Sequence, residues 1–217
     1  MFTLVFKKEI ELYRASLGVF ETNCYILVHT IVQKALVVDP GDEGFEIYSF
    51  CRSQGWEIET IFLTHGHWDH IGGVNELRKQ TEAPVLIHEA DASMLTDAHL
   101  NLSIFIGDPF CAESADSLVS RDAQLKFGPL MLNMLHVPGH TRGSVCLYTN
   151  DILIAGDTLF KHNVGRTDLP GGNENQLMHA IQTKLLALPD STTVFPGHGP
   201  ETTIEEEKKI QAYLWRH

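Results

Sequence analysis

One short segment constrains this chain more than any other, because it places four potential metal ligands within six residues. The segment reads THGHWDH (64–70), and its first histidine directly follows the apolar run IETIFLT (58–64), which predicts a buried strand. Its candidate ligands are His65, His67, Asp69 and His70. Imidazole and carboxylate groups are preferred ligands of zinc, iron and manganese. The segment therefore predicts a metal centre at the end of a strand.

The spacing within this segment predicts two neighbouring groups of ligands. Side chains alternate along an extended chain, so His65 and His67 point to one side. If the chain then turns into a helix near Asp69, that carboxylate and His70 face a neighbouring position, and one segment serves two adjacent metals. The alternative is a histidine-rich surface turn, but such a turn does not explain why the cluster lies between an apolar strand and a helix.

Three later residues repeat this arrangement, since each follows an apolar run and each is preceded by glycine. They are His140 after LMLNMLHV, Asp157 after DILI and His198 after TTVF. Glycine allows the backbone to turn sharply at the edge of a sheet. Each one alone is explained equally well as an ordinary turn. Together they place a polar ligand at the end of each of three strands, as a shared site requires.

Short apolar or alternating runs predict the strands of two sheets. These strands span 3–6, 9–14, 24–29, 34–39, 58–64, 84–88, 124–127, 130–137, 144–149, 151–156 and 192–196. Helices are predicted over 45–55, 70–80, 89–97, 175–188 and 205–215, the last with capping-box spacing from Thr203 to Glu206. The pattern predicts an α/β fold with four layers, an αββα sandwich, in a single domain over residues 1–217.

Composition narrows the expected partners. Lys and Arg total 16 and Asp and Glu total 28, so the formal charge is −12. An acidic surface repels phosphate backbones, so we expect a small-molecule substrate and no nucleic acid. No apolar run approaches the length of a membrane span, and the N-terminus becomes charged too soon for a signal peptide. We therefore expect a cytoplasmic protein without a membrane partner, either a monomer or a small homo-oligomer.

The ligand pattern resembles that of the metallo-β-lactamase superfamily, whose signature is H-x-H-x-D-H followed by a distant His, Asp and His. All of these blocks are present in order between His65 and His198. Further segments look like the type II glyoxalase (hydroxyacylglutathione hydrolase) branch of that superfamily. These segments are NCY (23–25), PGHT (138–141), GDTLF (156–160) and GRTD (165–168). The resemblance implies the αββα fold, in agreement with the strand pattern.

The resemblance also implies two divalent metals, zinc foremost, with iron or manganese as alternatives. The first site would use His65, His67, His140 and Asp157. The second would use Asp69, His70, His198 and, as a bridge, again Asp157. A hydroxide bridging the two cations would attack a thioester carbonyl, with S-lactoylglutathione or a related acyl thiol as substrate. Asp69 and Asp157 are the expected catalytic residues, the former because it is placed to orient the water.

Other activities remain open at this point. His65, His140 and Asp157 alone supply a two-histidine, one-carboxylate triad for a single ferrous iron, as in persulfide dioxygenases, which this chain also resembles. A non-catalytic metal sensor is a third possibility, but the complete ligand set argues against it. Secreted lactamases usually carry an export signal and often a cysteine ligand, and this chain has neither at the matching places.

Two basic residues are candidates for binding the anionic end of a substrate. Lys161 and Arg166 follow Asp157 in a loop rich in glycine and polar residues. Alternatively, Arg166 pairs with Asp168 and braces the loop. The loop 97–110 exposes apolar residues and either covers the site or packs into the core.

Three threonines lie directly beside candidate ligands in the sequence. Thr64, Thr141 and Thr158 either hydrogen-bond ligands or are simple turn residues.

Typical glutathione-thioester hydrolases continue beyond the last ligand with a helical region that holds glutathione, whereas here the tail has room for about one helix. That helix is expected to cover apolar core with Ile210, Leu214 and Trp215. The chain thus resembles a short form, in which we expect weak dependence on glutathione.

Overall fold

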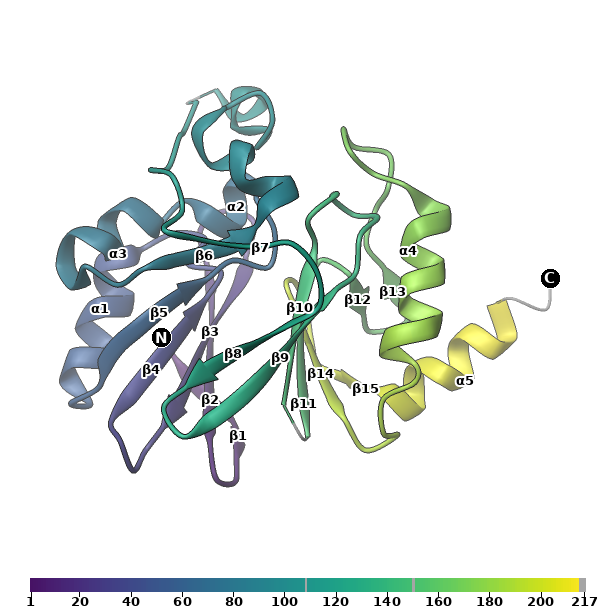
Figure 1. Ribbon diagram of the computed structural model, residues 1–217, viewed down its shortest axis with the longest axis horizontal. Coiled ribbons are helices and arrows are strands. Elements are labelled where there is room, and N and C mark those ends of the chain that lie inside the picture. The colour runs from purple at the N-terminus through teal and green to yellow at the C-terminus, as the bar shows by residue number, and fades with distance from the viewer. Residues whose placement is uncertain (108, 150, 215–217) are drawn as a thin grey trace.

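Two β-sheets lie face to face, with helices against the outer face of each (Figure 1). The structure is a computed structural model that describes residues 1–107, 109–149 and 151–214, and side chains as far as residue 210. The predicted αββα sandwich is therefore confirmed.

The first sheet contains seven strands in the described part of the chain, and their order across the sheet is their order in sequence. They are β1 (Thr3–Lys7), β2 (Glu11–Leu17), β3 (Thr22–His29), β4 (Lys34–Val38), β5 (Glu57–Phe62), β6 (Val85–His88) and β7 (Ser117–Val119). Strands β4 to β7 are parallel, so they need crossover connections. The helical elements in these connections are α1 (Gly44–Ser53), α2 (Trp68–Ile71), α3 (Val74–Thr81), η1 (Glu89–Thr96) and η2 (Ser103–Ile106).

The second sheet has the order β15-β14-β11-β10-β9-β8. Its strands are β8 (Ala123–Phe127), β9 (Leu130–His136), β10 (Val145–Thr149), β11 (Ile152–Gly156), β14 (Thr193–Pro196) and β15 (Thr202–Thr203). The remaining elements are the ribbon β12 (Leu159–Phe160) with β13 (Asn163–Val164), helix α4 (Glu174–Ala180), its π-helical continuation η3 (Ile181–Leu185), and α5 (Ile204–Leu214). Since β11 and β14 are parallel, α4 and η3 form the crossover between them.

Alternation along the central strands produces the layers. In β3, Cys24, Ile26 and Val28 pack toward α1 and α3, whereas Tyr25 and Leu27 pack between the sheets. The side chains of β11 alternate in the same way: Ile152 and Ile154 pack between the sheets, and Leu153 and Ala155 pack in the core beneath α4. Strands buried on both faces are what a four-layer architecture requires.

Several predicted elements differ in detail. The helix predicted over 70–80 is two helices, because Gly72 and Gly73 carry the backbone close to another loop: a Cβ at Gly73 would lie 2.8 Å from the carbonyl oxygen of Asp42. The helix predicted over 89–97 is 3-10 helical and spans Glu89–Thr96, and the helix predicted over 175–188 ends in the π-helical turn η3. Strands β7, β12, β13 and β15 were not predicted, since two or three residues carry too little periodicity.

Helix α5 begins near its predicted start. The amide of Glu206 donates to the Thr203 hydroxyl at 3.2 Å, which supplies one half of the predicted capping box. Ile210 is half-buried, and the side chains of Leu214 and Trp215 lie outside the described residues. Among the described helices, none is both long and apolar enough to cross a bilayer.

Candidate metal centre

The seven predicted ligands meet at one end of the sandwich, although they come from five places in the chain. His65 and His67 follow β5, Asp69 and His70 lie in α2, His140 lies between β9 and β10, Asp157 follows β11, and His198 follows β14. The backbone is extended at His67 and α2 begins at the next residue. This confirms the predicted change from extended chain to helix, which separates the first two histidines from Asp69 and His70.

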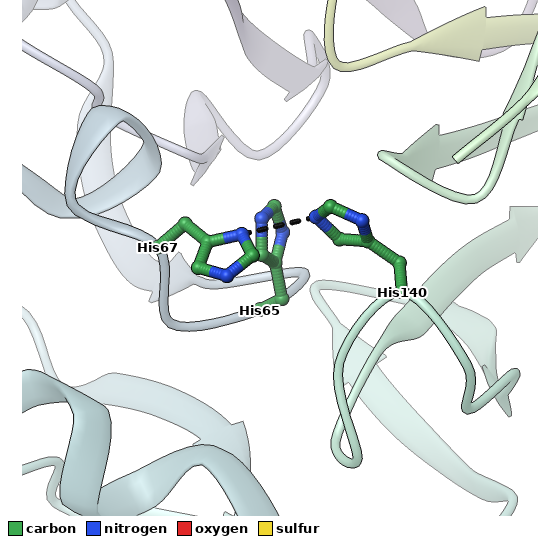
Figure 2. A group of neighbouring side chains, drawn as sticks. All are labelled: His65, His67 and His140. Carbon is green, nitrogen blue, oxygen red and sulfur yellow. Dashed lines mark hydrogen bonds between the residues drawn. The ribbon is translucent and has the colours of Figure 1, made fainter. Parts of the chain in front are cut away.

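Three histidines form a first group, shown in Figure 2, where their rings face a common centre. One nitrogen from each of His65, His67 and His140 lies within 4.8 Å of the others, and all three side chains are buried. The Nδ1 of His67 and the Nε2 of His140 are 3.0 Å apart. Two nitrogens bound tetrahedrally to one zinc at 2.0–2.1 Å would be about 3.3 Å apart. The observed spacing therefore suits a shared cation.

Asp69, His70 and His198 form a second group beside the first. The Nε2 of His198 lies 3.2 Å from Asp69 Oδ2, and the Nε2 of His70 lies 3.7 Å from the same oxygen. The ligand atoms of this group also lie within 4.8 Å of one another. The His65 and His70 rings are 4.2 Å apart, so the two groups adjoin.

Asp157 lies between the groups and faces both. Its Oδ1 is 3.4 Å from His70 Nε2, and its Oδ2 is 3.7 Å from the Nε2 of both His140 and His198. The backbone after β14 approaches this carboxylate so closely that a Cβ at Gly197 would lie 2.2 Å from Oδ1. Only glycine fits there, which explains the glycine before His198.

Buried polar atoms without partners mark the centre as a place for cations. These atoms are His65 Nε2, His70 Nε2 and Asp157 Oδ1. A buried polar atom without a hydrogen bond costs about 1–3 kcal/mol, so a cluster of them needs a compensating ligand. Imidazole and carboxylate donors in this arrangement fit divalent metals, whereas an apolar ligand would leave them unsatisfied.

Hydrogen bonds at the outer nitrogens orient three of the rings. The Nδ1 of His70 lies 2.9 Å from Asp39 Oδ2. The Nδ1 of His140 lies 2.8 Å from the Arg166 carbonyl oxygen, and the Nδ1 of His198 lies 3.1 Å from the Phe20 carbonyl oxygen. If each Nδ1 donates its proton there, each Nε2 presents its lone pair to the centre.

Asp39 is a functional residue that the sequence interpretation missed. It is buried, and its oxygens accept from the Thr64 amide at 2.8 Å, the Thr64 hydroxyl at 2.6 Å and His70 Nδ1. Its carboxylate also lies within 4.8 Å of ligand atoms of His65 and His70, but because both oxygens already accept hydrogen bonds, we assign it the role of supporting the ligands. It ends an apolar strand, close to the position that the predicted ligands occupy, but no glycine precedes it and it was included in the predicted strand 34–39.

The charges of the centre also favour cations. Burial lowers the pKa of His65 well below its ordinary value, and burial with the neighbouring His140 lowers that of His67 to about 3, so both are neutral and able to bind metal. Burial opposes protonation of His70, but Asp157, Asp69 and Asp39 outweigh it and raise its pKa. Several carboxylates thus draw positive charge into the centre, which a divalent cation would supply.

The threonines beside the ligands have different contacts. The Thr64 hydroxyl lies 3.1 Å from His65 Nδ1, so it contacts a ligand as expected. The Thr141 hydroxyl instead donates to Asp91 at 2.6 Å. Thr158 lies in the turn after β11, where its backbone bonds to Ala155 and Gly165.

Arg166 meets the centre through its backbone. Its guanidinium forms two 2.8 Å hydrogen bonds with Asp168 and is 61% exposed, while its carbonyl accepts from His140. The Lys161 ammonium lies 3.9 Å from Glu206.

The loop from residue 97 contacts α2, since the Trp68 amide donates to the Asn101 carbonyl at 3.0 Å. The same loop leaves apolar side chains such as Phe105 exposed.

Comparison with known proteins agrees with this geometry. A sequence model of the metallo-beta-lactamase superfamily matches residues 17–198. The chain is 40% identical to the probable metallo-hydrolase YqgX of Bacillus subtilis (strain 168), over 93% of this chain and 96% of that protein. It is 30% identical to the hydroxyacylglutathione hydrolase GloC of Haemophilus influenzae, over 90% of this chain and 93% of that protein.

Solved structures show the same fold. The B3 metallo-beta-lactamase BLEG-1 has a TM-score of 0.88 at 36% identity, over 91% of this chain and 96% of that one. TTHA1623 in a di-iron-bound form has a TM-score of 0.77 at 30% identity, over 91% of this chain and 97% of that one. ETHE1 from Myxococcus xanthus has a TM-score of 0.74 at 28% identity, over 96% of this chain and 82% of that one. The four-layer fold, the two adjoining ligand groups and the family match together show that the chain belongs to the metallo-β-lactamase superfamily.

Proposed function

We propose that this protein is a hydrolase that cleaves thioesters with two divalent metals, and that its substrate is S-lactoylglutathione or a related acyl thiol. The observation that carries the proposal is the position of Asp157, whose two oxygens face both ligand groups. A centre divided in this way would accommodate two adjacent cations. The similarity to a hydroxyacylglutathione hydrolase supports a thioester as the bond that is cleaved.

The first metal would be held by His65, His67, His140 and Asp157, and the second by Asp69, His70, His198 and Asp157. Zinc suits the many imidazoles, and the relative in a di-iron-bound form supports iron as an alternative. When bound, the two cations would lower the pKa of water and polarise a carbonyl oxygen.

The protein's own groups supply orientation. The Asp69 and Asp157 side chains are 16% and 14% exposed, so solvent reaches carboxylates that are otherwise enclosed. Asp69 also contacts the Thr22 hydroxyl at 3.3 Å and His198, which restrict its rotation. A carboxylate fixed in this way can accept a hydrogen bond from an attacking water and hold it toward the substrate carbonyl.

A thiol nucleophile is not placed for this reaction. Burial raises the pKa of Cys51 and Cys146 to about 12, and Cys24 is buried as well. Cys111 is exposed but is absent from both ligand groups. We therefore assign the attack to water and not to a cysteine.

Loading the purified protein with zinc, iron or manganese is expected to produce thioesterase activity that a chelator abolishes and added metal restores. Release of free thiol from S-lactoylglutathione and from other acyl thiols measures it. A β-lactam in parallel tests the chemistry of BLEG-1, whose structure is similar. If the metal-loaded protein cleaves no acyl thiol, or cleaves only the β-lactam, the proposal is wrong.

A persulfide dioxygenase with one ferrous iron is the second candidate. His65, His140 and Asp157 lie together as that activity needs, with His140 Nε2 3.7 Å from Asp157 Oδ2. It would leave Asp69, His70 and His198 without a role, and for this reason we favour hydrolysis. One iron per chain with oxygen uptake on glutathione persulfide would support the oxygenase, whereas two metals without oxygen uptake would exclude it.

The rate should depend weakly on the thiol carrier. Helix α5 is engaged in packing through buried Ile204 and Glu207, and Arg166 is already neutralised by Asp168. If one basic residue still binds a substrate carboxylate, the gain is about 1.5–3 kcal/mol, or roughly 10–150-fold. We expect specificity constants for one acyl group on glutathione and on a smaller thiol to differ by no more than this. A preference of several thousand-fold would reveal a dedicated glutathione site.

A further inference from the structure

Asp91, a residue outside the ligand set, lies between the two loops that carry the first group. It belongs to η1, the residue is 1% exposed, and its carboxylate accepts three hydrogen bonds. Oδ2 accepts from the Thr141 hydroxyl at 2.6 Å and from the Gly66 amide at 3.3 Å. Oδ1 accepts from the Gly143 amide at 2.8 Å.

These three donors belong to the backbone segments of the first ligand group. Gly66 lies between His65 and His67, and Thr141 directly follows His140. The two segments are more than 70 residues apart in sequence, as His67 and His140 show. Asp91 is therefore a single anchor that joins the loop after β5 to the loop between β9 and β10.

The second loop is built around the carboxylate. A Cβ at Gly143 would lie 2.7 Å from Asp91 Cγ, so the close approach requires glycine. The Thr141 hydroxyl and Ser144 Oγ are 2.7 Å apart, and the Thr141 amide donates to the same Ser144 oxygen at 3.1 Å. These contacts fix the direction of the Thr141 hydroxyl toward Asp91.

Burying this carboxylate is costly, which calls for a specific role. Within the described chain, its partners are hydroxyl and amide groups and not a cation. Burial raises its pKa, against the opposing effect of the Thr141, Gly143 and Gly66 donors. A purely structural link between two loops could be made by neutral groups at lower cost. Another buried carboxylate, Asp39, contacts His70 of the second group directly and Thr64 beside His65 of the first.

We propose that Asp91 is a positioning residue that holds His65, His67 and His140 at the spacing one cation needs. It acts through the backbone and the Thr141 hydroxyl, and it does not bind the cation. This inference rests on the metal binding set out under the proposed function. It goes further by naming a residue that holds the first group alone, whereas Asp39 contacts His70 of the second group and Thr64 beside His65 of the first.

The test uses Asp91→Asn, which keeps the side-chain volume but places an amide N–H in competition with the Gly66 or Thr141 donor. Titration against a competing chelator should show two metals per chain in the wild type and a roughly 10–100-fold weaker affinity for one of them in the variant, the range for loss of an outer partner of a ligand. Asp116→Asn is the matched control. Asp116 also binds a backbone amide, that of Val85 at 2.8 Å, but it lies outside the ligand groups and should leave both affinities unchanged.

Combining variants identifies which metal is affected. His198→Ala is expected to remove the second metal, so adding Asp91→Asn to it should also weaken the metal that remains. If the remaining metal binds as in His198→Ala alone, Asp91 does not serve the first group and the inference is wrong. Equal affinities in Asp91→Asn and the wild type would overturn it too, even if the metal-free variant melts at a lower temperature.

A second pair of variants covers the case in which Asp91→Asn does not fold. Thr141→Val removes the hydroxyl that Asp91 accepts from, whereas Thr141→Ser retains it. We expect the valine variant to weaken the first metal and the serine variant to bind it normally. Loss of affinity in both would contradict a role for the hydroxyl bond. A wild-type chain that binds no metal would instead refute the proposed function itself, independently of the variants.

Discussion

The Asp157→Ala variant is expected to lose tight binding of both metals and more than about 100-fold of its thioesterase activity. Loss of an outer partner of a ligand already costs about 10–100-fold in metal affinity, and a group that faces both cations should cost more. The Asp157 oxygens lie 3.4 Å from His70 Nε2 and 3.7 Å from His140 Nε2, so the carboxylate belongs to both groups. Its removal also withdraws negative charge from a buried centre that must hold two cations.

Metal per chain after dialysis, measured together with the rate, checks this expectation. Asp157→Asn is the matched variant, because it keeps the shape and one oxygen but carries no charge, and it should retain more metal than alanine. An Asp157→Ala protein with two metals per chain and an unchanged rate would show that Asp157 does not bridge. Far-ultraviolet circular dichroism of each variant shows whether the fold is intact.

The His198→Ala variant is expected to fall from two metals per chain to one. His198 Nε2 lies 3.2 Å from Asp69 Oδ2, which places it with the second group, while the mutual contacts of His65, His67 and His140 do not involve it. The first metal should therefore remain. The rate should fall at least about tenfold, because a water held by one cation is less strongly activated than a water held by two.

Elemental analysis of the purified variant measures this result. His179→Ala serves as the control, because His179 is exposed on α4 and belongs to neither ligand group. If His198→Ala still contains two metals, the division into two groups is wrong. If it contains none, the two sites depend on one another more strongly than the geometry indicates.

Local patterns in the sequence were sufficient to predict the fold class and the seven candidate ligands, whereas the assignment of the later residues to one site or the other was implied only by the family resemblance. Strand β3 is an alternating run whose two faces enter different cores, and such alternation can be recognised without knowledge of the partners. The segment at residues 64–70 carries its own geometry, because an extended chain that turns into a helix at Trp68 separates four side chains into two directions. Asp157 and His198 were recognisable because glycine and a preceding strand constrain the local backbone.

The contacts that support the ligands could not be predicted in this way, because they join segments that are distant in the chain. Asp39 reaches His70 across 31 residues, and Asp91 reaches Thr141 across 50. Arg166 presents its carbonyl to His140 while its side chain pairs with Asp168, a choice that sequence left open between two roles.

The sequence by itself therefore indicated which residues are candidates to carry the donor atoms, since residue type and local backbone set that. Only the tertiary structure decided which donors share a cation site, which oxygens of Asp157 face which group, and which buried aspartates hold them there. The physical reason is that a hydrogen bond or a metal site depends on separations of about 3 Å between atoms, and packing of the two sheets, not spacing along the chain, fixes those separations.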